Sequence, residues 1–119
     1  MSNLVNDFKK LETEVRKQLQ RQGRKLLVVE YPSRPGRAYM FKAPKGFAWV
    51  HIKTRLNCLR VGTDQAWATK AGVACGGYQK FNTAHNNPGY HWDIAQGDNI
   101  SLLKVARYLA QICRARHSD

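Results

Sequence analysis

GFAWVHIKTRLNCLRV, residues 46–61, is the stretch that decides the fold. It predicts two strands, at 47–53 and 56–61, joined by a tight two-residue connection. Side chains alternate between the two faces of a strand. One face of the first strand is apolar and suited to packing under a helix: Ala48, Val50 and Ile52. The stretch therefore predicts a hairpin with one face turned toward a core.

The opposite face of the same strand runs from aromatic to basic residues: Phe47, Trp49, His51 and Lys53. This face has two interpretations. It is an exposed surface on which bases stack, or Phe47 and Trp49 belong to the core. Large aromatic side chains supply much of the buried area in a small domain, which favours the core.

Toward the N-terminus the pattern continues with two more strands, at 26–31 and 38–42. Between them, residues 32–37 (PSRPGR) contain two prolines and a glycine, which is typical of a turn. Arg34 and Arg37 are expected to be exposed at its tip. The four strands predict an antiparallel meander.

Helices are expected at both ends of the chain. Residues 3–24 place apolar side chains at three- and four-residue spacing, on one stripe of a basic, amphipathic helix: Leu4, Phe8, Leu11, Val15 and Leu19. Residues 98–116 predict a second helix, packed across the sheet. Between the fourth strand and this helix lie an irregular segment, 62–89, with a short helix at 64–72, and a strand at 90–94.

These elements predict an α+β fold in one domain, residues 1–119, with a mainly antiparallel sheet of four to five strands within residues 26–96. No apolar run approaches the ~20 residues that span a bilayer, and the N-terminus lacks the apolar region of a signal peptide. We therefore expect a cytoplasmic protein with no membrane partner. The oligomeric state stays open.

Charge is the strongest indication of function, with 20 Lys and Arg against 8 Asp and Glu, a net charge of +12. Residues 24–60 hold nine basic residues and a single acid, Glu30, with aromatic residues between them. Such a field attracts polyanions, and phosphates are neutralised by Lys and Arg. The prediction is a non-enzymatic nucleic-acid-binding protein, with DNA favoured over RNA. The candidate contact residues are Arg34, Arg37, Lys42, Lys45, Trp49, Lys53, Arg55 and Arg60.

Two other functions remain open: an interaction protein that binds an acidic protein partner, and a small metal-dependent nuclease. The nuclease would use His85, His91 and Asp93, which lie within nine residues of one another. Zinc-type cysteine and histidine spacings, phosphate-binding glycine motifs and a cluster of carboxylates are all absent from the sequence. We therefore expect no catalytic residues, no metal and no cofactor. Three widely spaced cysteines fit reduced thiols.

The stretches at 46–61 and 89–112 (GYHWDIAQGDNISLLKVARYLAQI) resemble a family of small uncharacterised bacterial domains. These domains are sometimes labelled predicted transport proteins and also occur appended to restriction-type nucleases. The similar region covers residues 46–114. The layout also resembles the double-wing domain of phage-type transcription factors, a likeness of fold alone. The resemblance implies an accessory nucleic-acid-binding module and carries over no catalytic residue.

Overall fold

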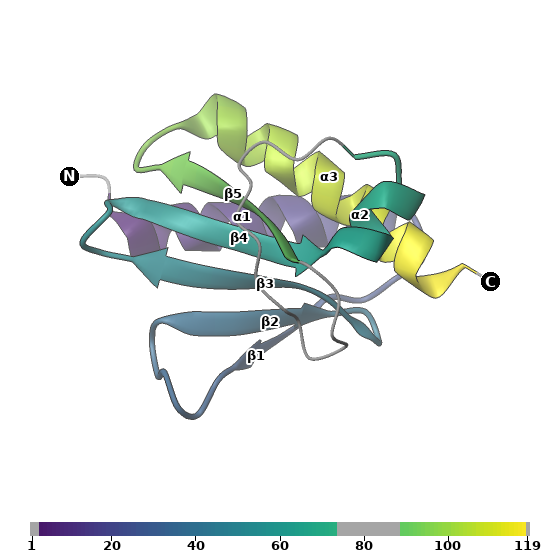
Figure 1. Ribbon diagram of the computed structural model, residues 1–119, viewed down its shortest axis with the longest axis horizontal. Helices are drawn as coiled ribbons and strands as arrows, with labels where there is room; N and C mark the ends of the chain where they lie inside the picture. The colour runs from purple at the N-terminus through teal and green to yellow at the C-terminus, as the bar shows by residue number, and fades with distance from the viewer. Residues whose placement is uncertain (1–2, 74–88, 119) are drawn as a thin grey trace.

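A computed structural model describes residues 3–73 and 89–118 (Figure 1). The elements, in chain order, are α1 (Leu4–Gln20), β1 (Leu27–Glu30), β2 (Ala38–Lys42), β3 (Gly46–Lys53), β4 (Cys58–Asp64), α2 (Gln65–Lys70), β5 (Gly89–Ala95) and α3 (Asn99–His117). The five strands form one antiparallel sheet in the order β1-β2-β3-β4-β5. The predicted α+β fold is confirmed.

Helices α1 and α3 lie side by side against one face of the sheet (Figure 1). The core between the layers contains side chains with no exposed area, among them Leu11 and Val15 of α1, Phe41 of β2, and Leu109 of α3. The buried carboxylate of Asp7 accepts a hydrogen bond from the Gly97 N–H at 3.0 Å, which ties α1 to the turn before α3.

Both long helices begin after an N-cap residue of a type that is favoured at that position. Asn3 begins α1 by accepting a hydrogen bond from the Asn6 N–H, and Asp98 begins α3 by accepting one from the Ser101 N–H. Helix α1 ends at Gln20, four residues before the predicted end. Its chain reverses at Gly23, whose φ of 70° is a left-handed conformation that glycine adopts at little cost.

The fourth strand differs most from its predicted bounds of 56–61. Leu56 and Asn57 form the turn, with Asn57 at a φ of 54°, so β4 starts at Cys58. It then continues through Gly62 and Thr63 to Asp64, and the predicted irregular segment 62–89 is wrong over these residues. Thr63 stays in the sheet because its buried hydroxyl donates to the Phe47 carbonyl at 2.8 Å.

Phe47 does not share a face with Trp49, contrary to strict alternation along the third strand. The β2–β3 register shifts between Phe41 and Lys42, which pair with Ala48 and Gly46. Phe47 is the extra residue of this bulge. Its ring is fully buried, 6.4 Å from that of Phe41. The core interpretation therefore holds for Phe47, whereas Trp49 is half-buried on the opposite face.

Trp49 depends on the glycine opposite it, and we predict that Gly62→Ala destabilises the fold. The two residues are paired across β3 and β4, and a β-carbon at position 62 would overlap Nε1 of the indole. Displacing a packed ring of this kind costs about 1–3 kcal/mol. Urea unfolding measures the change.

Gly46→Ala is the matched control, since its β-carbon would meet only the flexible end of Met40, at 3.0 Å from the sulfur. Equal stability of the Gly62→Ala and Gly46→Ala variants would contradict the proposed packing.

Candidate functional site

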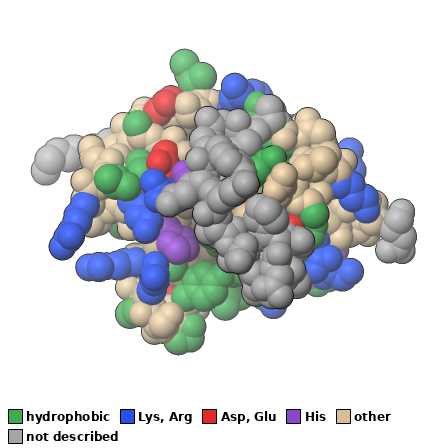
Figure 2. Space-filling view, viewed as in Figure 1, with side chains coloured by type: hydrophobic (Ala, Val, Ile, Leu, Met, Phe, Trp, Pro, Cys, Tyr) green, Lys and Arg blue, Asp and Glu red, His purple; other side chains and the backbone are tan. Residues whose placement is uncertain are grey.

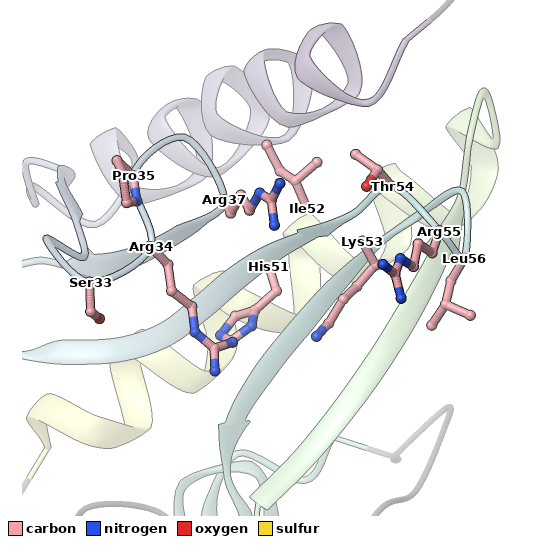
Figure 3. A pocket seen from close by; sticks show the side chains of 10 residues that line it. All are labelled: Ser33, Arg34, Pro35, Arg37, His51, Ile52, Lys53, Thr54, Arg55 and Leu56. Atoms are coloured by element: carbon pink, nitrogen blue, oxygen red, sulfur yellow. The ribbon is translucent and has the colours of Figure 1, made fainter.

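An open groove of about 740 Å³ lies at the end of the sheet where the β1–β2 loop meets the β3–β4 turn (Figure 3). It brings together side chains that are far apart in sequence, and no Asp or Glu of the described residues is in its lining. The basic lining residues are Arg34, Arg37, His51, Lys53 and Arg55. Figure 2 shows Lys and Arg side chains gathered at this end, beside histidine. The groove is therefore a concave cationic surface.

The β1–β2 loop is held in place by its own backbone and by one acid. Glu30, the only acid in residues 24–60, accepts a hydrogen bond from the Gly36 N–H at 2.8 Å. Gly36 has a φ of 71°, which explains glycine at this position. The Arg37 carbonyl accepts from the Ile52 N–H at 2.8 Å, so the loop is anchored on β3. Glu30 thus shapes the groove without lining it.

Basic side chains reach the groove from both sides of the sheet end. His51 and Lys53 alternate with the buried Ile52, so they lie on the face opposite α1 and α3. Arg34 extends toward His51 on this outer face, whereas Arg37 and Ile52 lie on the side nearer α1 (Figure 3). Arg34, Arg37 and Arg55 are exposed. An anion in the groove would therefore meet guanidinium groups on both rims.

Two hydroxyl groups also line the groove, beside the apolar side chains of Pro35, Ile52 and Leu56. Ser33 and Thr54 come from the loop and the turn, and both are exposed. Their hydroxyls donate hydrogen bonds, as phosphate oxygens require. Sequence reasoning did not assign these two residues or His51 to the site. Their proximity to Arg34 and Arg55 in the sequence was the available signal for Ser33 and Thr54.

The positive potential of the groove acts on the pKa of His51. Burial lowers its pKa below the usual value of 6.5, and the positive charges of Lys53, Arg34 and Arg60 lower it further. The imidazole is therefore neutral at pH 7 in the free protein. Its titration reports the positive potential of the groove.

The structure divides the eight predicted contact residues. Arg34, Arg37, Lys53 and Arg55 line the groove. The other four residues, Lys42, Lys45, Trp49 and Arg60, lie outside it.

Lys42 and Lys45 lie at the opposite end of the β2–β3 hairpin, and the Lys45 N–H donates to Nε2 of His117 at 3.0 Å. Trp49 lies between these two ends, over Gly62. One groove cannot use all eight residues.

Arg60 and Asp93 form a two-pronged ion pair across β4 and β5. Nε and one terminal nitrogen of Arg60 donate to the two carboxylate oxygens at 2.8 and 2.9 Å. The arginine holds the pKa of Asp93 below its usual value. The charge of Arg60 is therefore largely compensated, and Asp93 is engaged as an acceptor.

This ion pair involves one residue of the predicted nuclease site, which consists of His85, His91 and Asp93. His91 is buried, and its Nε2 lies 4.0 Å from Asp93 Oδ1. His85 lies outside the described residues. Over residues 3–73 and 89–118, no three His, Cys, Asp or Glu side chains are arranged to hold a metal ion. A carboxylate bound on both oxygens by Arg60 is a poor ligand or base.

Comparison of the chain with protein-family models, curated proteins and solved structures finds no match. The resemblance to the small bacterial domains therefore stays a prediction. Within the described part of the chain, no helix is both long and apolar enough to cross a membrane. The chemistry of the groove itself must carry the functional argument.

We predict that Lys53→Gln raises the pKa of His51, because one of the positive charges acting on the imidazole is removed. The histidine proton shifts in NMR spectra recorded against pH measure this value. Lys104→Gln is the control, since Lys104 is exposed on α3 and has no part in the groove. A His51 pKa that responds equally to both variants would show that the potential is not local.

Proposed function

We propose that this chain is a non-enzymatic nucleic-acid-binding protein and that its cationic groove holds the phosphate backbone. The observation that carries the proposal is the convergence of four basic side chains on one open groove: Arg34, Arg37, Lys53 and Arg55. In the part of the chain that the structure describes, no acid lines this groove. Over the described residues, none of the four forms an ion pair. Phosphate groups bind where such donors face solvent, and they release their counterions on binding.

The cost of the unbound groove supports the same function. Like charges held close together repel one another, and after burial the positive charges of Lys53, Arg34 and Arg60 are the second cause of the lowered pKa of His51. A fold gains nothing in stability from such a cluster. A bound polyanion relieves the repulsion and makes charge-assisted hydrogen bonds. Binding a phosphate chain therefore lowers the electrostatic free energy of the groove.

DNA is favoured over RNA because of where the arginines sit. Arg34 and Arg37 are exposed on a projecting loop, 31–37, which is able to enter a groove of a duplex. The major groove of B-form DNA is wide enough for protein elements, whereas that of A-form RNA is deep and narrow. Arginine at a loop tip also makes two-pronged contacts with guanine.

An acidic protein partner remains the second candidate, since carboxylates bind the same donors as phosphates. Such a partner predicts a stable protein complex and no affinity for nucleic acid. The nucleic-acid proposal predicts the reverse, with a strong dependence on salt.

The test is a triple variant, Arg34→Gln, Lys53→Gln and Arg55→Gln, titrated with a short fluorescent DNA duplex. Each lost phosphate contact costs about 0.5–1 kcal/mol at an exposed site, so the affinity should fall roughly 10- to 100-fold at low salt. Each contact also contributes about −0.9 to the slope of log K against log salt, and the slope should flatten by about 2 to 3. A matched single-stranded DNA and an RNA duplex rank the ligands.

The matched control removes three charges from exposed positions of α3: Lys104→Gln, Arg107→Gln and Arg114→Gln. Net charge then falls equally in the two variants, and only the groove variant should lose most of its affinity. Equal losses would locate binding in the overall field and refute the groove. Absence of binding by the wild-type chain, even at low salt, would refute the function.

A further inference from the structure

His51 occupies the middle of the groove, and the proposed function assigns it no part. It lies on β3 two residues before Lys53, lines the groove with Arg34 and Arg55, and is half-buried. Its neighbour across β2 is Ala38, and across β4 it is Arg60. A phosphate group bound in the groove would therefore contact the imidazole of His51.

The charged groups around His51 come from every element at this end of the sheet. Arg34 and Arg37 come from the β1–β2 loop, Lys53 from β3, and Arg55 from the turn. Arg60 comes from β4, with Asp93 of β5 bound to it. Two acids lie near this set: Glu30, whose carboxylate accepts from the Gly36 N–H in the β1–β2 loop, and Asp93, which is paired with Arg60.

A phosphate in the groove would reverse the balance at His51. In the free protein partial burial, and after it the surrounding cations, lower the pKa of His51 and so disfavour the charged imidazolium. A phosphate brings a negative charge to the same place, which favours imidazolium. Imidazolium also donates hydrogen bonds from both ring nitrogens, whereas neutral imidazole donates from one.

We propose that His51 binds a backbone phosphate as imidazolium, and that filling the groove takes up one proton from solvent at this ring. The proton adds to the free ring nitrogen, and no other bond is formed or broken. This inference rests on the proposed function of the groove, and it adds His51 to the residues that bind the ligand.

The sign of the pH dependence follows from linkage. The pKa of His51 is low in the free protein and higher in the complex, so the complex holds more protons between these two values. Affinity must then rise as the pH falls through that window, and it levels off above and below it. Each unit of difference between the two pKa values is a tenfold change in affinity.

The experiment is calorimetry with the full chain and a short DNA duplex, in two buffers of different ionisation enthalpy, from pH 5 to pH 8. The difference in binding enthalpy between the buffers counts the protons taken up. We expect an uptake approaching one proton within the window for the wild-type chain. His51→Gln should lose this uptake, and with it the rise in affinity on lowering the pH.

His117→Gln is the control, because His117 lies at the far end of the hairpin against the Lys45 backbone. It should keep the proton uptake of the wild type. Salt-dependent binding without proton uptake in the wild-type chain would overturn the role of His51 and leave the proposed function standing. An uptake that survives in His51→Gln would overturn it as well, and absence of all binding would overturn both.

Discussion

Leu11 and Val15 on α1, and Leu109 and Ile112 on α3, are completely removed from solvent against the same face of the sheet. That burial requires each strand to present its apolar side chains to the helices, and a shift of one residue would exchange the two faces. The side chains of His51 and Lys53, which alternate with the buried Ile52, are consequently directed to the outer face. The position of His51 and Lys53 at the groove follows from this packing.

The meander order of the strands then creates the groove itself. Successive antiparallel strands bring the β1–β2 loop and the β3–β4 turn to the same end of the sheet. Each of these short connections carries arginine, and the chain between them places Lys53 at the junction. Glu30 accepts a hydrogen bond from the Gly36 N–H and holds the loop, and it is not among the residues that line the groove. The sheet therefore supplies both the concave shape and the sign of the potential.

Local patterns predicted the elements well because the helical stripes and the 46–61 hairpin rest on burial. They failed where one local contact determines which face a side chain is on or where a strand ends. Phe47 faces the core because it is the extra residue of a β-bulge, and the alternation of side chains between the two faces of a strand does not predict a bulge. Gly62 and Thr63 have the composition of a loop, yet both pair with β5, and the Thr63 hydroxyl also donates to the Phe47 carbonyl. Four of the eight predicted contact residues lie outside the groove, since sequence distance does not reveal that Lys45 lies beside His117.

Net charge and binding surface are different properties in this chain. On α1, Arg16 and Lys17 are paired with Glu12 and Glu14 at 3.0 and 3.4 Å, and exposed pairs of this kind add little to stability while they reduce the local field. Arg60 is compensated in the same way by Asp93. The uncompensated charges of the groove differ in that they share one concave space with donors on both rims. Under the proposed function, the total charge would accelerate the approach of a polyanion from any direction. The groove would then offer several donors to one phosphate chain and so convert the encounter into a complex.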